Sequence, residues 1–232
     1  MIELVALDMA GTTIDDHGAV YVALRRSVEE TGATVDNADL QKWMGTDKIA
    51  AITALMVLGG QVLSPERAAA AFTRFRAILA ESYRERPPVA LPGVVAGLTE
   101  LRERGIAIAL TTGFSDDVAE PLLDSLGWTI GDGDTHLLDA VVTSTDVAAG
   151  RPAPYLIHHA MELTGVRDVR RVLAAGDTVV DLEAAANAGA ISVGVLSGAL
   201  TRAQLLAHPH DFLLDSVADL PGLLQVELAF AN

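Results

Sequence analysis

Residues 2–13 read I-E-L-V-A-L-D-M-A-G-T-T, and this stretch decides the fold expected for the rest of the chain. Its first six residues form a short, mostly apolar run, as in a strand buried on both faces of a parallel sheet. The run stops at Asp8, and Gly11 with the two threonines then turns the chain. A carboxylate at the carboxyl end of a central strand lies where open α/β sheets bind ligands. The alternative is that Asp8 only caps a following helix, a position that Asp and Thr both favour.

The composition limits the partners that the protein can bind. The 232 residues carry a formal net charge of −15, which disfavours nonspecific nucleic-acid binding because that requires basic surfaces. An anionic substrate would need local positive charge from a metal ion, an arginine, a lysine or helix N-termini. The sequence has no cysteine, which excludes disulfides, thiolate metal sites and cysteine nucleophiles. Neither a signal peptide nor a bilayer-spanning run is recognised, so a cytoplasmic protein without a membrane partner is expected.

Apolar spacing and helix-ending residues divide the chain into a helical part and an alternating part. Residues 15–88 are expected to be wholly helical, with helices at 20–31, 37–44, 48–58 and 64–84. After residue 91, helices are expected at 94–104, 116–126, 152–163 and 180–188. They alternate with strands expected at 106–110, 140–142, 171–175 and 191–195, with a candidate edge strand at 212–214. Residues 131–135 are expected to form a polar loop.

This order of elements predicts an α/β protein with a doubly wound parallel sheet. Residues 1–14 and 89–232 would form the sheet domain, and residues 15–88 a smaller helical domain inserted after the first strand. The continuous apolar face at residues 55–58 is expected to be the core of that insert or a homodimer contact.

Polar groups follow four of the expected strands and converge if all the strands are parallel. They are Asp8, the pair Thr111 and Thr112 before Gly113, Arg151 in G-R-P-A-P, and Asp177 with Asp181 in G-D-T-V-V-D. Two or three carboxylates with an arginine and a hydroxyl suit a hard divalent cation and a phosphoryl group. Each motif alone is weak evidence for such a site, since an Asp-Thr pair, for example, usually caps a helix. All of the motifs together, in this order along the chain, are strong evidence for it.

With these motifs the chain resembles the haloacid dehalogenase-like superfamily over nearly its whole length. The matching segments are D-M-A-G-T at 8–12, T-T-G at 111–113, G-R-P at 150–152 and G-D-T-V-V-D at 176–181. The resemblance implies a Rossmann-like core, a cap domain formed by residues 15–88, and Mg²⁺ as cofactor. It also implies roles for the site residues: Asp8 as nucleophile, Thr112 as phosphate ligand, Arg151 as phosphate clamp, Thr12 and Gly113 as substrate contacts, and Asp8, the Ala10 carbonyl, Asp177 and Asp181 as the metal site.

Two departures narrow the resemblance to the phosphonatase-like (phosphonoacetaldehyde hydrolase-related) subgroup. Ala10 replaces the usual second aspartate, which protonates an ester leaving group, and the chain reads M-G-T-D-K at Met44–Lys48. When a C–P bond is cleaved, the leaving group departs as carbon and an electron sink is needed to take its electron pair. A Schiff base on Lys48 would supply this sink, provided that the amine is neutral when it attacks the substrate. The subgroup carries a histidine where this chain has Ala51, and a tyrosine where this chain has Phe114. Phe114 and Met44 are candidate substrate contacts.

Other interpretations stay open at this stage. Lys48 opens an apolar helix, where a solvated lysine is ordinary, and the acidic Asp47 beside it would keep the ammonium charged. The function expected first is Mg²⁺-dependent cleavage of a small phosphonate through an aspartyl phosphate on Asp8. The second is a phosphomonoesterase acting on a small phosphorylated metabolite, and the third is a non-catalytic phosphate-binding module.

Overall fold

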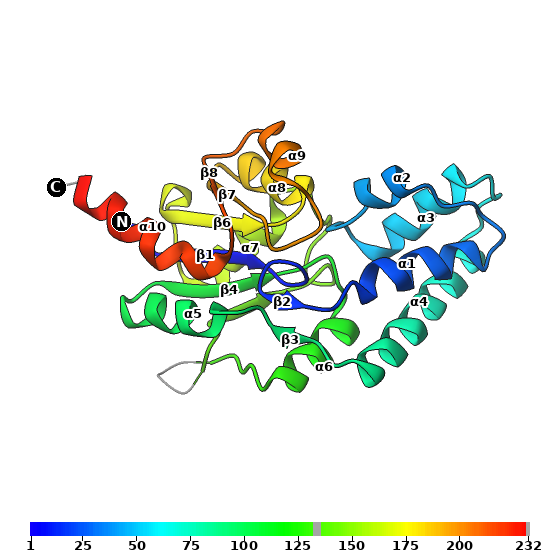
Figure 1. Cartoon of the computed structure of the whole chain (residues 1–232), viewed down its shortest axis with the longest axis horizontal. Coiled ribbons are helices and arrows are strands. Elements are labelled where there is room, and N and C mark those ends of the chain that lie inside the picture. The colour runs from blue at the N-terminus through cyan, green and yellow to red at the C-terminus, as the bar shows by residue number, and fades with distance from the viewer. Residues whose placement is uncertain (132–135, 231–232) are drawn as a thin grey trace.

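A parallel sheet forms the centre of the protein in a computed structural model that describes residues 1–131 and 136–230 (Figure 1). In the described part, six strands pair in the order β5-β4-β1-β6-β7-β8, and every pairing is parallel. Their bounds are β1 Leu4–Asp8, β4 Ala107–Thr111, β5 Ala140–Val142, β6 Val172–Gly176, β7 Ile191–Val195 and β8 Phe212–Leu214. The chain moves outward from β1 in both directions, which confirms the predicted doubly wound fold.

The two faces of β1 enter two different parts of the core. Val5 and Leu7 belong to the cluster that includes α5 (Val94–Glu103). Leu4 and Ala6 belong to the cluster of α7 (Tyr155–Thr164) and α8 (Val179–Ala188), so helices cover both faces of the sheet (Figure 1). Because every residue of β1 is buried, the strand appears in the sequence as an apolar run instead of an alternating pattern.

Four helices between residues 15 and 88 pack on one another beyond one end of the sheet (Figure 1). They are α1 Ala19–Glu29, α2 Asn37–Lys42, α3 Lys48–Leu58 and α4 Pro65–Glu85, and residues 15–88 are called the four-helix segment below. Leu55 and Met56 of α3 are buried in its core, whereas Val57 and Leu58 are exposed. A homodimer through this face stays a prediction.

A short antiparallel ribbon connects the four-helix segment to the sheet. It consists of β2 (Ile14–Asp15) and β3 (Val89–Ala90), and Asp15 pairs with Val89. The prediction that residues 15–88 are wholly helical is therefore wrong at Asp15. Strands of two residues are too short to produce an alternating pattern, so nothing in the local sequence marked them.

The remaining differences from the predicted elements lie in turns and near the C-terminus. Helix α6 covers Asp116–Leu126 as predicted, but α7 begins at Tyr155 because residues 152–154 form a turn. Two helices were not predicted, α9 (Arg202–Leu206) and α10 (Leu220–Phe230). Most of the predicted polar loop, residues 132–135, lies outside the described residues. Every described helix is too short or too polar to cross a membrane.

Candidate active site

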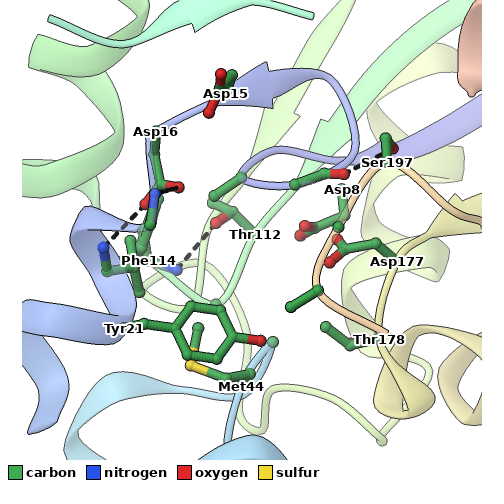
Figure 2. A pocket seen from close by; sticks show the side chains of 18 of the residues that line it. Asp8, Asp15, Asp16, Tyr21, Met44, Thr112, Phe114, Asp177, Thr178 and Ser197 are labelled. Carbon is green, nitrogen blue, oxygen red and sulfur yellow. Dashed lines mark hydrogen bonds between the residues drawn. The ribbon is translucent and has the colours of Figure 1, made fainter. Parts of the chain in front are cut away.

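The carboxyl ends of neighbouring strands bring the predicted site residues together. Asp8 ends β1 and is in register with Thr111 at the end of β4, while Asp177 directly follows β6. Figure 2 shows the carboxylates of Asp8 and Asp177 pointing toward one another, with Tyr21 and Met44 on the opposite side of the cavity. The simple alternative for Asp8 as a helix cap is wrong, because Asp8 is the buried last residue of a central strand.

Three buried carboxylates form an acidic cluster. Asp8, Asp177 and Asp181 each offer an oxygen, and these oxygens all lie within 4.8 Å of one another. Burial and the two neighbouring carboxylates raise the pKa of Asp177 well above its usual range. A divalent cation bound by carboxylate oxygens would remove this repulsion, and oxygen ligands are those that Mg²⁺ prefers. The donor set therefore fits the predicted magnesium site.

The three carboxylates differ in their surroundings. Asp8 and Asp177 line the cavity, whereas Asp181 accepts hydrogen bonds from the backbone and hydroxyl of Thr178 at the start of α8. Thr12 is also absent from the described residues that line the cavity, and its hydroxyl donates to Asp177 Oδ1 at 2.9 Å. We therefore expect Asp8 and Asp177 to contact the metal directly. Asp181 and Thr12 would hold the surrounding groups in place.

Magnesium binding tests this acidic cluster. Asp177→Asn removes one of the two carboxylates that face the cavity, so the Kd for Mg²⁺ measured by calorimetry should rise by at least about tenfold. A chelator should abolish hydrolysis by the wild-type protein. Asp168→Asn, at an aspartate far more exposed than Asp177, is the matched control and should bind Mg²⁺ as the wild type does. Equal Mg²⁺ affinity in the Asp177→Asn variant would contradict the assignment.

Arg151 is buried behind the acidic cluster with a partner for every side of its guanidinium. Nη1 donates to Asp8 Oδ1 at 2.6 Å, and Nε lies 2.9 Å from Asp181 Oδ1. Nη2 donates to the carbonyl and hydroxyl of Thr111, each at 2.8 Å. Burial alone would lower the pKa of Arg151, but the carboxylates of Asp181 and Asp8 outweigh it and raise the pKa. Arg151 is therefore a permanent cation that fixes the orientation of Asp8.

Lys48 is buried in the cavity, so the interpretation of a solvated lysine is wrong. Only 4% of the residue is exposed, and Nζ donates to the carbonyl of Thr46 at 2.9 Å. Nζ also lies 5.5 Å from the centre of the Phe114 ring. Burial lowers the pKa of Lys48 to about 8, although Asp8 and, to a smaller extent, Asp47 act in the opposite direction. The carboxylate of Asp47 accepts a hydrogen bond from Ala50 N and caps α3.

Lysine is rare in this chain, which makes its buried position informative. The sequence contains two lysines, Lys42 and Lys48, among 16 basic residues. Lys42 is exposed, whereas Lys48 faces the active-site cavity. Arginine cannot lose its proton in a protein, so a buried lysine is the basic residue that can become a neutral amine.

Two glycines allow the loop before Lys48 to approach the sheet. A Cβ atom on Gly113 would lie 2.3 Å from the carbonyl oxygen of Thr46, and one on Gly45 would lie 2.6 Å from Thr178 Oγ1. Gly45 also has a positive φ of 79°, and its carbonyl accepts a hydrogen bond from Arg151 at 3.3 Å. The loop that precedes Lys48 therefore lies directly on the strand ends that carry the predicted phosphate site.

The cavity at these strand ends has a volume of about 340 Å³. Eight of the predicted site residues line it: Asp8, Ala10, Met44, Lys48, Thr112, Gly113, Phe114 and Asp177. Arg151, Asp181 and Thr12 lie behind its wall, where they contact the lining residues. Thr112 Oγ1 accepts a hydrogen bond from Phe114 N, which leaves its own proton available for a ligand.

Sequence reasoning missed several residues that line the cavity. Tyr21 of α1 donates its hydroxyl to Gln41 Oε1 at 2.8 Å, and burial raises its pKa to about 12. Asp16 accepts from Gly18 N and Val20 N and so fixes the start of α1. The hydroxyl of Ser197 donates to the carbonyl of Gly11 at 2.7 Å. Ser197 could have been predicted, because it follows strand β7 at the same edge of the sheet as the other site residues. Tyr21 could not, because the apolar spacing of α1 does not show which of its residues face the cavity.

The geometry agrees with the comparison to known families. A model of the haloacid dehalogenase-like hydrolase family matches residues 2–189. This chain belongs to the haloacid dehalogenase-like hydrolases. As a member of this hydrolase family it is an enzyme, which sets aside the hypothesis of a non-catalytic phosphate-binding module.

Relatives of known sequence place this haloacid dehalogenase-like hydrolase in the phosphonatase-like subgroup. It is 28% identical to a phosphonoacetaldehyde hydrolase of Parabacteroides distasonis over 95% of each chain. It is 32% identical to a phosphonoacetaldehyde hydrolase of Lysinibacillus sphaericus, over 85% of this chain and 76% of the relative.

Two solved structures share the fold of this chain. A hydrolase from Pseudomonas syringae superposes with a TM-score of 0.83 at 22% identity, covering 97% of this chain and 98% of the other. A phosphonoacetaldehyde hydrolase-like protein from Oleispira antarctica gives a TM-score of 0.79 at 24% identity, covering 97% of this chain and 91% of the other.

Proposed function

We propose that this hydrolase cleaves the C–P bond of a small phosphonate that carries an aldehyde two carbons from phosphorus, such as phosphonoacetaldehyde. The observation that carries the proposal is the buried amine of Lys48 in the same cavity as the carboxylate of Asp8. Ala10 lines this cavity where an acid for an oxygen leaving group would be expected. A site without that acid but with a buried amine suits a leaving group that departs as carbon.

Lys48 would prepare the substrate for bond cleavage. Its neutral Nζ adds to the aldehyde carbon to form a carbinolamine. The carbinolamine oxygen then takes up a proton from solvent and leaves as water, and a protonated imine remains between the lysine and the substrate. The cationic nitrogen then accepts the electron pair that the breaking C–P bond releases. The ring of Phe114, whose centre lies 5.5 Å from Nζ, would stabilise the cationic imine nitrogen by a cation–π contact.

Asp8 would receive the phosphoryl group. One of its carboxylate oxygens attacks phosphorus, the C–P electron pair moves to carbon, and an enamine on Lys48 remains. The enamine gains a proton at carbon and is hydrolysed to acetaldehyde and free lysine, while water hydrolyses the aspartyl phosphate to phosphate. A bound Mg²⁺ would neutralise negative charge on the phosphoryl oxygens and on Asp8.

The surrounding residues would position and enclose the phosphoryl group. Arg151 fixes one oxygen of Asp8 at 2.6 Å, which leaves the other oxygen to attack phosphorus. The free proton of the Thr112 hydroxyl would be donated to a phosphoryl oxygen. The four-helix segment, residues 15–88, would act as the cap that covers the substrate, with residues 1–14 and 89–232 as the core.

Reductive trapping tests the Schiff base. Incubation with phosphonoacetaldehyde and borohydride, followed by peptide mass spectrometry, should place the reduced adduct on Lys48. Lys42 is an internal control, because it is exposed and should not be labelled at the same rate. Lys48→Arg keeps the charge but should lose both the adduct and phosphonate hydrolysis, whereas Lys42→Arg should retain both.

The pH dependence of trapping follows from the lowered pKa of Lys48, about 8. Only the neutral amine attacks, and its fraction grows as pH rises. The trapping rate should therefore increase about tenfold per pH unit below pH 8 and level off above it. If no adduct forms while simple phosphate esters are hydrolysed, the protein is a phosphomonoesterase and the phosphonatase proposal fails.

A further inference from the structure

A serine that follows β7 joins two loops at the active site. The hydroxyl of Ser197 donates to the carbonyl of Gly11, which belongs to the loop after β1, at 2.7 Å. In the sheet, β6 lies between β1 and β7, and Asp177 directly follows β6. Figure 2 shows Ser197 on the same side of the cavity as Asp8 and Asp177. The hydrogen bond therefore joins the two loops that flank Asp177.

The carboxylate of Asp177 is enclosed by the two loops that this bond joins. A Cβ atom on Gly198 would overlap Asp177 Oδ2, and one on Gly11 would lie 2.7 Å from the same oxygen. Thr12, in the same loop as Gly11, donates its hydroxyl to Asp177 Oδ1 at 2.9 Å. Gly198 does not have a positive φ, so lack of space, and not the backbone conformation, requires glycine there. Both oxygens of Asp177 are therefore held by the joined loops.

The Ser197 bond also fixes the backbone next to the carbonyl of Ala10. Gly11 N donates to the carbonyl of Ile14 at 2.8 Å, and the N–H and C=O of a trans peptide point in opposite directions. The Ala10 carbonyl therefore points away from Ile14, and Ala10 lines the cavity. Within the described part of the chain, no group donates a hydrogen bond to this carbonyl, which leaves it available to a cation. Bonds at Gly11 N and Gly11 O hold the peptide planes on both sides of Gly11.

We propose that Ser197 is a positioning residue for the magnesium site. Its bond to Gly11 would hold the loop after β1 against Gly198, so that the Ala10 carbonyl and the Asp177 carboxylate stay oriented for the same ion. Residues that orient metal ligands in this way typically change metal affinity by about 10–100-fold when they are mutated. This role rests on the Mg²⁺-dependent hydrolysis proposed above, but not on whether the bond that is cleaved is C–P or P–O.

Calorimetric titration with Mg²⁺ tests this role on the full chain without substrate. The Kd for Mg²⁺ should rise by about tenfold or more in Ser197→Ala, because the Gly11 carbonyl loses its donor. Ser197→Thr keeps a hydroxyl at this position and should bind Mg²⁺ nearly as the wild type does. Ser192→Ala is the matched control and should not change the Kd. The Ser192 hydroxyl lies on β7, is buried and has no hydrogen-bond partner in the described part of the chain.

Steady-state kinetics separates a positioning role from general damage to the site. The Mg²⁺ concentration for half-maximal phosphate release should rise about tenfold in Ser197→Ala, in parallel with the Kd. At saturating Mg²⁺, kcat should stay close to the wild-type value, because Asp8 and Lys48 are unchanged. The substrate is phosphonoacetaldehyde, or a simple phosphate ester if the wild type hydrolyses only that. A fall in kcat at every Mg²⁺ concentration, with an unchanged Kd, would overturn the proposed role.

Gly198→Ala gives a second test if Ser197→Ala folds poorly. Its Cβ atom would displace the carboxylate of Asp177, so the Kd for Mg²⁺ should again rise by about tenfold or more. Gly222→Ala is the control, because a Cβ atom there would meet no atom within 4 Å. Unchanged Mg²⁺ affinity in Ser197→Ala or in Gly198→Ala would overturn the role of Ser197 and leave the Mg²⁺-dependent function standing. A wild-type protein that binds no Mg²⁺ would overturn both.

Discussion

Asp8→Asn is expected to abolish hydrolysis of phosphonates and phosphate esters alike. The proposed aspartyl phosphate requires a carboxylate oxygen as nucleophile, and a neutral amide cannot replace it. Loss of a covalent nucleophile lowers kcat by about 10⁴-fold or more in enzymes that act through such an intermediate. The measurement is steady-state release of phosphate at saturating substrate and Mg²⁺.

The folded structure should tolerate this change, so a loss of activity would reflect loss of the nucleophile and not unfolding. Asparagine keeps an oxygen that can accept from Arg151, and it removes one of three crowded negative charges. The melting temperature in metal-free buffer should therefore equal or exceed that of the wild type. Substantial turnover by Asp8→Asn would show that Asp8 is not the nucleophile.

Arg151→Ala should impair both activity and stability. Truncation of one partner of a desolvated charge pair costs about 2–5 kcal/mol. If this free energy is lost from stabilisation of the transition state, kcat/KM should fall by more than about 30-fold. The carboxylates of Asp8 and Asp181 would also lose the cation that lies between them, at 2.6 Å and 2.9 Å. Leaving buried charges uncompensated destabilises folded proteins by about 3–5 kcal/mol, measurable by urea denaturation in metal-free buffer.

Two further variants separate the roles of charge and shape. Arg151→Lys keeps the positive charge but cannot contact Asp8, Asp181 and Thr111 at once, so an intermediate loss is expected. Arg171→Ala is the control, because Arg171 pairs with Glu3 on the surface, where such pairs contribute about 1 kcal/mol or less. Wild-type kinetics in Arg151→Ala would show that the arginine has no part in binding or orienting the phosphoryl group.

Local sequence signals account for the elements that were predicted well. Helix α3 covers Lys48–Leu58 as predicted because Asp47 caps its start and Gly59 follows its end. Helix α6 likewise ends at Leu126 and is followed by Gly127, whose positive φ suits glycine. The strands next to β1 were recognisable because burial on both faces requires a continuous apolar run. Polar residues after those strands then indicated the site, since parallel strands share one carboxyl edge.

Features that depend on distant parts of the chain were not visible in the sequence. The burial of Lys48 requires the ring of Phe114 and the contact of Gly113 with Thr46, which only the folded chain brings together. For the same reason, the influence of Asp47 on the amine was overestimated, because burial has the larger effect on the pKa of Lys48. Thr12 was assigned to the substrate from its motif alone, whereas its hydroxyl binds Asp177.

The β2–β3 ribbon has a consequence for how such enzymes could acquire new substrates. Both ends of the four-helix segment leave the sheet through this single ribbon, where Asp15 and Val89 are paired. A segment that enters and leaves at adjacent points can be exchanged for another of different length without shifting the register of β1 against β4. The ribbon thus marks a natural junction for chimeric proteins, in which Asp8 and the acidic cluster stay constant while the residues above them are replaced.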